Sequence, residues 1–297
     1  EKYGEYVVIT NVVDTIGFEF AKAFAKQGHS LVLIATKSEQ LEKVKHALEK
    51  CLHTDKKIVI LTYDEKQPEE ENFSSFEKAL TEVKDKIGIL VNNCTIRFKS
   101  GDNFLEYSRS EILDLMYADI GNPLLITRII VPIMAENKRG LILNVTIPNN
   151  FRPVEHKGFP HVMREFVDFF GTLIKKECES YNIKVQTLNP GWIEKGRKGS
   201  KRFPSFLVQT PTSFVESVMP SVGTTDKTTG FWLHTVFGRI IMHTPDFIHK
   251  CIYYLYRAVN GAYDDLNQTE EGEQLISDLE HLIKQNECEP ENKSDNP

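Results

Sequence analysis

Short apolar runs alternate with amphipathic stretches from the beginning of the chain. The amphipathic stretches have apolar residues at helical spacing, and the two longest span 112–134 and 159–181. Continuous apolar strands that alternate with helices are typical of a parallel sheet covered on both faces. The pattern therefore predicts a doubly wound α/β fold, with strands at 6–10, 30–35, 58–63, 88–92, 141–145 and 183–189.

The pattern changes after Pro190. Residues 195–230 contain a basic cluster and three prolines, which predicts an irregular excursion. The apolar run 230–236 predicts a last strand, and the aromatic and aliphatic residues that follow it predict C-terminal helices. We therefore expect one domain with a core, a substrate-loop excursion, a last strand with apolar helices, and a disordered polar tail, at 1–194, 195–230, 231–285 and 286–297.

Composition and charge narrow the class of protein. Hydrophobic residues make up 40% of the chain and charged residues 26%, as in ordinary folded proteins. The 36 basic and 42 acidic residues give a net charge of −6, whereas proteins that bind nucleic acid usually carry a basic excess. We therefore expect no nucleic-acid partner.

Cysteines, histidines and apolar runs give three further expectations. The five cysteines are scattered without C-x-x-C spacing, which argues against a disulfide scaffold and for a reducing compartment. His46 and His53 have no third ligand nearby, so we expect no metal. The sequence has no run of 18 or more apolar residues, so we expect no membrane-spanning helix in it. Since the chain begins with Glu1, we expect any targeting segment to lie upstream of it.

Three segments that follow predicted strands carry motifs. They read Thr10-Asn11-Val12-Val13-Asp14-Thr15-Ile16-Gly17, Asn92-Asn93-Cys94-Thr95 and Asn189-Pro190-Gly191. Together they resemble the short-chain dehydrogenase/reductase family, whose members show T-G-x-x-x-G-x-G, N-N-A-G and P-G at these places. The fragments GILVNN, FVDFF, PTSFVES and GFWLH narrow the resemblance to the hydroxysteroid dehydrogenases and very-long-chain 3-oxoacyl-CoA reductases of the endoplasmic reticulum. The resemblance implies a Rossmann-like parallel sheet of about seven strands with a helical C-terminal extension.

The resemblance also implies four catalytic positions, and none holds the expected residue. Members of the family use a tyrosine four residues before a lysine, a serine thirteen residues before the tyrosine, and an asparagine on the preceding long helix. These positions hold Pro160, Arg164, Ile147 and Asp119. Proline has no acidic proton and isoleucine has no hydroxyl, so neither can protonate or polarise a substrate carbonyl. We therefore expect no intact catalytic site.

A rearranged proton donor is the alternative. His161 follows Pro160, and His156 and Thr146 lie nearby in the sequence, so a histidine and threonine pair could replace the tyrosine. An ordinary loop position for His156 and an ordinary helix face for His161 are the competing interpretation.

The cofactor loop is altered as well. Asn11 and Thr15 occupy two of its three glycine positions, and only Gly17 remains. A β-carbon at position 15 hinders the approach of a diphosphate, so we expect NADP(H) binding to be weakened and no other cofactor. The resemblance assigns cofactor contacts to Thr10, Ile16, Gly17, Thr36, Lys37, Asn92, Asn93, Pro190, Gly191 and Ile193. In the alternative interpretation, Asn92 and Asn93 only tie adjacent strands and Pro190-Gly191 is only a turn.

Ligands and partners follow from the same resemblance. We expect a steroid or long-chain acyl ligand, and a homodimer formed through the helices at 112–134 and 159–181. The basic cluster at 195–202 attracts coenzyme A phosphates or anionic lipids, unless it is merely a solvated loop. The aromatic segment 231–258 contacts a membrane surface, or packs over the substrate cleft or a twin subunit. The expected location is the cytosolic face of the endoplasmic reticulum membrane, with mitochondria as the alternative.

Three functions remain open on the sequence alone. The leading hypothesis is a catalytically degenerate member of the family, close in character to inactive hydroxysteroid dehydrogenase-like proteins, which binds a lipid or a protein. The second is an active NADP(H)-dependent hydroxysteroid or 3-oxoacyl-CoA reductase with a rearranged proton donor. The third is a dimerising scaffold or regulator of an active relative.

Overall fold

The computed structural model describes residues 2–35, 38–62, 69–94, 105, 107–146, 158–191, 193, 208–245, 247–248 and 251. Within them, one parallel sheet has the strand order β3-β2-β1-β4-β5-β6-β7. The strands span Tyr6–Thr10 (β1), Ser30–Ala35 (β2), Ile58–Thr62 (β3), Ile87–Asn93 (β4), Gly140–Val145 (β5), Ile183–Leu188 (β6) and Lys227–Thr228 (β7). The order reverses at β1, which confirms the predicted doubly wound, Rossmann-like class.

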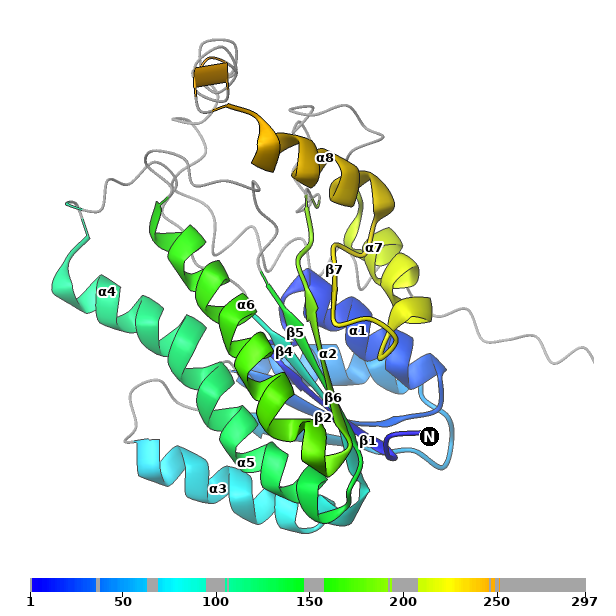
Figure 1. Ribbon diagram of the computed structural model, residues 1–297. Coiled ribbons are helices and arrows are strands. Elements are labelled where there is room, and N and C mark those ends of the chain that lie inside the picture. The colour runs from blue at the N-terminus through cyan, green and yellow to red at the C-terminus, as the bar shows by residue number, and fades with distance from the viewer. Residues whose placement is uncertain are drawn as a thin grey trace, which may run out of the picture.

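Helices cover both faces of the sheet (Figure 1). Three pack on one face, namely α1 (Thr15–Lys26), α2 (Ser38–Glu49) and α7 (Pro211–Val218). Three pack on the other face, namely α3 (Glu69–Thr81), α5 (Asn122–Glu136) and α6 (Gly158–Cys178). The remaining helices are α4 (Arg109–Met116) and α8 (Trp232–His243), and short turns of helix lie at Lys84–Lys86, Glu179–Tyr181 and Met219–Ser221.

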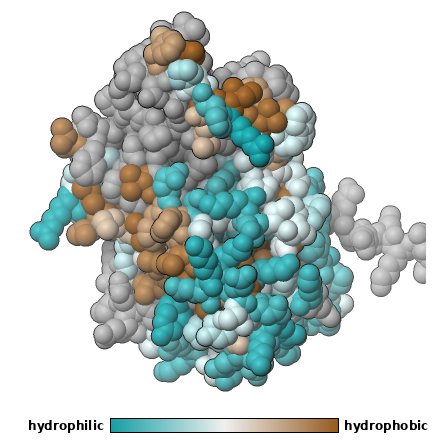
Figure 2. Space-filling view, viewed as in Figure 1, coloured by the Kyte–Doolittle hydropathy of each residue, from teal (hydrophilic) through white to brown (hydrophobic). Residues whose placement is uncertain are grey.

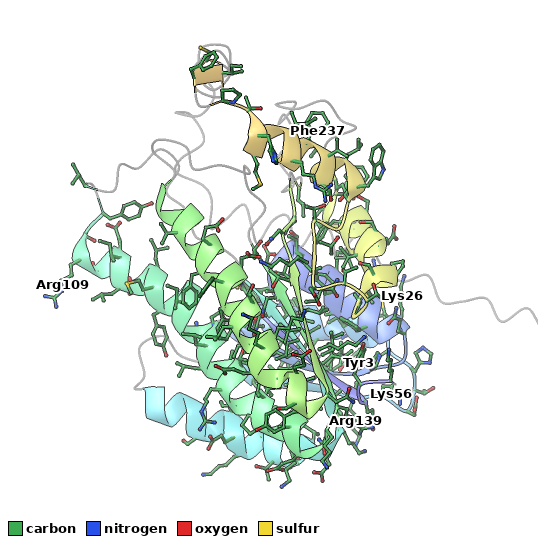
Figure 3. All side chains as sticks on the ribbon, in the orientation of Figure 1. Tyr3, Lys26, Lys56, Arg109, Arg139 and Phe237 are labelled. Carbon is green, nitrogen blue, oxygen red and sulfur yellow. The ribbon has the colours of Figure 1, made fainter. Side chains whose placement is uncertain are left out.

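The apolar strands are explained by burial on both sides. Successive side chains of a strand point to opposite faces. In β1, Val7 and Ile9 pack toward α1, α2 and α7, while Val8 packs toward α3, α5 and α6. Side chains fill the space between the sheet and each helical layer (Figure 3). Because neither face meets water, these strands read as unbroken apolar runs and not as an alternation.

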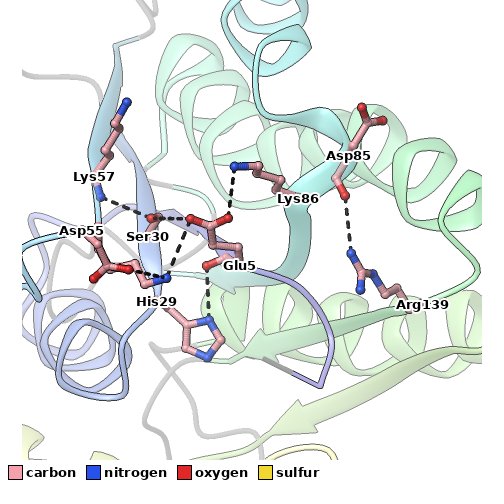
Figure 4. A network of polar contacts seen from close by, with 9 residues as sticks. Glu5, His29, Ser30, Asp55, Lys57, Asp85, Lys86 and Arg139 are labelled. Atoms are coloured by element: carbon pink, nitrogen blue, oxygen red, sulfur yellow. Dashed lines mark hydrogen bonds and ion pairs between the residues drawn. The ribbon is translucent and has the colours of Figure 1, made fainter.

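Charged groups hold the amino ends of the strands together (Figure 4). The Glu5 carboxylate accepts a hydrogen bond from Ser30 Oγ at 3.5 Å and lies 3.3 Å from Lys86 Nζ. Ser30 Oγ in turn accepts the backbone N–H of Lys57 at 3.2 Å. These contacts join the starts of β1, β2, β3 and β4. The motifs singled out in the sequence lie at the opposite, carboxyl edge of the sheet.

The predicted long helix 112–134 is interrupted. It consists of α4, a wider π-helical turn at Tyr117–Gly121, and α5. The second long helix, predicted at 159–181, is confirmed as α6 followed by a short 3-10 turn. In the part of the chain that the structure describes, no helix has the length and apolar character needed to cross a membrane.

The structure corrects the prediction of a last strand at 230–236. Gly230 has a φ of 73°, and α8 begins two residues later. Trp232, Val236 and Ile240 recur four residues apart, which fits a helix, and a short apolar run alone cannot distinguish helix from strand. Among the described residues the last strand is β7, which pairs with the end of β6.

Residues 195–230 are not irregular throughout, because α7 and β7 lie in their second half. Thr210 caps α7 by accepting the N–H of Ser213 at 3.1 Å, and Pro211 occupies the first helical position. Residues 194–207 and the predicted tail 286–297 lie outside the described residues. Cys51 is disulfide-bonded, although the scattered cysteines favoured a reducing compartment, whereas Cys94, Cys178 and Cys251 are free.

Candidate functional site

The turn between β1 and α1 has the conformation that glycine favours, although asparagine occupies it. Asn11 has a φ of 51°, in the left-handed region. Asparagine tolerates that region better than most residues. The Asn11 carbonyl also accepts the N–H of Asp14 at 3.1 Å, which closes the turn. The backbone path expected for the first glycine of the motif is therefore retained.

Asp14 and Thr15 form the start of α1. Asp14 is the N-cap residue, and its Oδ2 accepts the N–H of Ile16 at 3.1 Å. Thr15, at the second glycine position, is the first helical residue, and both it and Asp14 are only 2% exposed. A capping side chain at this place contributes about 1 kcal/mol to helix stability.

Gly17 allows a close approach between α1 and the end of β4. A β-carbon on Gly17 would lie 2.6 Å from the Asn11 carbonyl oxygen and 2.8 Å from Asn93 Nδ2. Asn93 Nδ2 donates to the Asn11 carbonyl at 3.2 Å and lies 3.4 Å from Asp14 Oδ2. The third glycine of the motif therefore has its expected steric role, and Asn93 braces the loop.

Thr10 and Asn92 make contacts inside the protein. Thr10 Oγ1 accepts the N–H of Asn93 at 3.0 Å, which joins β1 to β4. Asn92 is fully buried, and its Nδ2 donates to Thr127 Oγ1 at 2.9 Å and to Asn144 Oδ1 at 3.0 Å. Asn92 therefore ties β4 to α5 and β5, which is the structural role weighed against cofactor binding.

A chain of polar contacts joins the ends of β5 and β6 to α6. Thr146 Oγ1 donates to Asn189 Oδ1 at 2.9 Å, and Asn189 Nδ2 donates to Asp168 Oδ1 at 3.1 Å. The other oxygen of Asp168 lies 2.6 Å from Lys227 Nζ. The carboxyl edge of the sheet and the middle of α6 are thus held together.

Three of the four positions predicted to be catalytic lie on elements that the structure describes. Pro160 and Arg164 lie in the first two turns of α6, with Arg164 one turn before Asp168. Asp119 lies in the π-helical turn between α4 and α5. Ile147 lies outside the described residues, immediately after Thr146 in the sequence. The fold therefore keeps the elements on which a catalytic site of this family would be built.

The start of α6 explains why proline is tolerated at position 160. Pro160 lies in the first turn of the helix, where a backbone N–H has no intrahelical partner and its absence costs little. A proline at this position therefore does not break the helix.

Pro190, Gly191 and Ile193 connect the sheet to the C-terminal part. A β-carbon on Gly191 would lie 2.6 Å from His234 Cγ of α8. His234 is fully buried, and its ring meets that of Phe231 edge to face, with centroids 5.1 Å apart. Ile193 forms a parallel bridge with Gln209. Because Gly191 has no β-carbon, α8 can pack closely against the end of β6.

Two predicted cofactor residues are not placed. Thr36 and Lys37 lie outside the described residues, as do His156 and the side chain of His161. Among the residues that are described, no group of three or more His, Cys, Asp or Glu side chains could hold a metal ion.

One buried ion pair lies beside the loop, between α1 and α7. Lys22 Nζ is 3.9 Å from Glu19 Oε1, and both side chains are almost fully buried. Burial raises the pKa of Glu19 and lowers the pKa of Lys22, although the two charges attract each other. Loss of water is the largest effect on each group.

This arrangement defines the class of protein. A parallel sheet whose first strand runs through a left-handed turn into a glycine-dependent helix start is the architecture of dinucleotide-binding α/β proteins. A family model described as short chain dehydrogenase matches residues 5–202, and the chain belongs to that family. The expected resemblance is thereby confirmed.

Relatives of known name include both reductases and an inactive protein. The very-long-chain 3-oxoacyl-CoA reductase of Homo sapiens is 26% identical over 263 residues, which cover 88% of this chain and 82% of the relative. The inactive hydroxysteroid dehydrogenase-like protein 1 of Homo sapiens is 24% identical over 252 residues, which cover 84% and 74%.

Solved structures share the fold. A 7beta-hydroxysteroid dehydrogenase structure superposes with a TM-score of 0.72 at 16% identity, covering 84% of this chain and 96% of the other. A short-chain dehydrogenase from Sphingobium yanoikuyae in complex with NADPH has a TM-score of 0.62 at 23% identity, covering 73% and 83%.

Sequence reasoning missed the contacts that organise the site. Asp14 as helix cap was not singled out, although its place just before Thr15 and Ile16 is an N-cap signal. The chain Thr146–Asn189–Asp168 was missed because its members are far apart in sequence. No local pattern could have connected them.

Proposed function

We propose that this protein is a catalytically silent member of the short-chain dehydrogenase family, which binds a lipid or a protein partner in steroid or fatty-acyl metabolism without reducing a carbonyl. The observation that carries the proposal is the combination of preserved elements and replaced residues. The π-turn, the end of β5 and the start of α6 are present, and the resemblance to the family assigns the catalytic positions to Asp119, Ile147, Pro160 and Arg164, none of which is the residue that the family uses.

The chemistry of the replacements supports this proposal. A positioned proton donor accelerates such a reaction by about 10²–10⁴-fold, and oriented polar stabilisation of the developing charge adds about 10²–10³-fold. Pro160 and Ile147 supply neither effect. Arg164 keeps a positive charge but has no tyrosine whose pKa it could lower. A relative that is 24% identical is itself named as inactive.

The Thr146 hydroxyl does not favour a rearranged proton donor. It is 1% exposed and donates to Asn189 Oδ1 at 2.9 Å, so it holds the strand ends together. A hydroxyl engaged in this way would have to break a buried hydrogen bond before it could serve a substrate.

The backbone conformation of the cofactor loop is compatible with a bound dinucleotide. Asn11 adopts the left-handed turn, and Gly17 keeps the close approach to Asn93. Thr10, Ile16, Gly17 and Asn93 would surround NADP(H), with Gly191 near the nicotinamide side. When bound, the nicotinamide supplies a hydride. We propose that binding persists at reduced affinity, because Thr15 carries a β-carbon where the motif has glycine.

Exposed apolar side chains support a homodimer through α4, α5 and α6. Leu113 and Met116 on α4 are 55% and 45% exposed, and Phe169 and Leu173 on α6 are 75% and 47% exposed. Figure 2 shows apolar side chains on the side of the molecule where α4 and α6 lie. A second copy would bury them. The variant Phe169→Glu is expected to shift the protein to monomer in light scattering, whereas Trp232→Glu on α8 leaves the dimer unchanged.

The exposed face of α8 supports contact with a membrane surface. Trp232, Val236 and Ile240 are 68%, 44% and 57% exposed along one stripe of the helix. A tryptophan at the end of an exposed apolar stripe is typical of helices that lie at the interface between lipid and water. We propose the cytosolic face of the endoplasmic reticulum membrane as the location. Trp232→Glu should weaken sedimentation with anionic vesicles, whereas Phe169→Glu should not.

Turnover tests the silent site directly. The purified protein is incubated with NADPH and a steroid ketone or a long-chain 3-oxoacyl-CoA, and NADPH oxidation is followed by absorbance. We expect no rate above that of heat-inactivated protein. Turnover by the wild-type protein would refute the proposal, and its loss on His161→Ala would then identify the rearranged donor.

A restored variant supplies the positive control. It combines Asp119→Asn, Ile147→Ser, Pro160→Tyr and Arg164→Lys, so that each position carries the residue that the resemblance to the family assigns to it. Measurable reduction by this variant, together with silence of the wild type, would show that the four residues and not the fold limit the chemistry. The single change Arg164→Lys is the matched control and should remain silent.

A further inference from the structure

Two buried polar atoms at the start of α1 lack partners among the described residues. They are Oδ1 of Asp14 and Oγ1 of Thr15, and each residue is 2% exposed. An unsatisfied buried polar atom costs about 1–3 kcal/mol, so such atoms usually meet a protein group, water or a ligand. Two of them side by side at one helix start indicate a place for a bound group.

The surroundings favour a negatively charged group. The helix α1 has twelve residues, and the first N–H groups of a helix have no intrahelical acceptor. Of these N–H groups, that of Ile16 donates to Asp14 Oδ2. The positive end of the helix dipole adds to the attraction for an anion at Thr15 and Gly17.

The two unpartnered atoms have opposite requirements. An ionised carboxylate oxygen can only accept a hydrogen bond, so Asp14 Oδ1 needs a donor. The hydroxyl of Thr15 can donate, so it can serve a phosphate oxygen. Inorganic phosphate or diphosphate offers acceptors mainly. A ligand that carries a diphosphate and sugar hydroxyls together offers both, and this is the chemistry of a dinucleotide.

We propose that the Thr15 hydroxyl donates to a phosphate oxygen of NADP(H) at the start of α1, and that Asp14 Oδ1 accepts from a hydroxyl of the same dinucleotide. Thr15 then recovers, through its hydroxyl, part of the affinity that its β-carbon costs. The inference rests on the retained NADP(H) binding proposed above. It makes Thr15 a specificity-determining residue at a position where the family motif has glycine.

Binding without turnover tests this assignment. Isothermal titration measures the affinity for NADPH, for ADP-ribose, which carries the diphosphate and ribose but no nicotinamide, and for inorganic diphosphate. We expect NADPH and ADP-ribose to bind the wild-type protein and diphosphate to bind at least about tenfold more weakly. Thr15→Val keeps the shape and removes the hydroxyl, and it should weaken NADPH and ADP-ribose binding by about tenfold or more. Thr15→Ser should retain most of the affinity.

Matched variants separate a lost hydroxyl from a damaged fold. Thr81→Val removes a hydroxyl that donates to the Glu77 carbonyl of its own helix, and it should leave every affinity unchanged. Asp14→Asn offers a donor where an acceptor is required, and it should weaken ADP-ribose binding more than diphosphate binding. Thermal unfolding of each variant verifies that it is folded. If Thr15→Val does not fold, the affinities of Thr15→Ser are compared with those of the wild type instead.

Several results would overturn the assignment. They are equal NADPH affinity in Thr15→Val and wild type, diphosphate binding as tight as that of ADP-ribose, or no heat with either nucleotide. All of them leave the silent catalytic site untouched, because turnover is measured separately. Conversely, turnover by the wild type would refute the silent site and leave the role of Thr15 standing.

Discussion

Gly191 is the point at which α8 rests on the end of β6, and Gly191→Ala tests that contact. The new β-carbon would lie 2.6 Å from His234 Cγ and 2.8 Å from two further ring atoms. Real carbon contacts are more than half an ångström longer. Since His234 is fully buried, the ring cannot simply swing into solvent. Overpacking of this kind costs about 1–3 kcal/mol of unfolding free energy, or roughly 2–12 °C in Tm for a chain of this size.

Urea and thermal unfolding measure this loss, and tryptophan fluorescence reports where it is felt. One of the two tryptophans of the chain, Trp232, opens α8 and should change its emission when the helix is displaced. Gly121→Ala is the matched control, because its β-carbon would meet only Tyr117 at an ordinary 3.4 Å. A loss below about 0.5 kcal/mol in Gly191→Ala, or an equal loss in Gly121→Ala, would refute the packing argument.

Three further variants probe the helix layers and the site. Because burial raises the pKa of Glu19 above its usual 4.5, the folded protein keeps that proton to higher pH than the unfolded chain does. The stability of the wild type relative to Glu19→Gln should therefore fall as the pH rises above about 4.5, by at most about 1.4 kcal/mol per pH unit. Urea unfolding at a series of pH values measures this difference, and a relative stability that rises with pH would contradict the argument. Asp168→Ala leaves the amide of Asn189 without its acceptor and should cost about 1–3 kcal/mol in urea unfolding, whereas an unchanged midpoint would show that the contact is dispensable. Asn11→Val places a branched side chain at a φ of 51° and should cost about 1–2 kcal/mol, while Asn11→Gly is the matched control and should remain close to wild type in Tm.

The parallel core could be predicted from the sequence because its signal is local. Each buried strand is an unbroken apolar run, and each covering helix repeats apolar residues at its own period. The predicted strand at 30–35 coincides with Ser30–Ala35, and the one at 6–10 with Tyr6–Thr10. The region 230–236 was predicted wrongly because a segment of seven residues that is mostly apolar fits either period. Gly230 and the i, i+4 spacing of Trp232 and Val236 decided in favour of a helix.

The candidate site was only partly accessible from the sequence. Motif spacing identified Gly17 and Asn93, and the structure brings them within contact distance. The same spacing could not show that the Asn92 amide donates hydrogen bonds to Thr127 and Asn144, since these contacts depend on how α5 crosses the sheet. Buried atoms without partners, such as Thr15 Oγ1, are properties of packing and have no signature in the order of residues.

The position of Pro160 in the opening turn of α6 has an evolutionary consequence. A lineage can exchange a catalytic tyrosine for proline at such a place without an accompanying repair elsewhere, because the helix has no bond to lose there. Selection for a stable fold then does not act against the loss of the catalytic residue. Silent members of an enzyme family should therefore arise readily, and remain well folded, wherever the reacting groups stand at the ends of helices and strands.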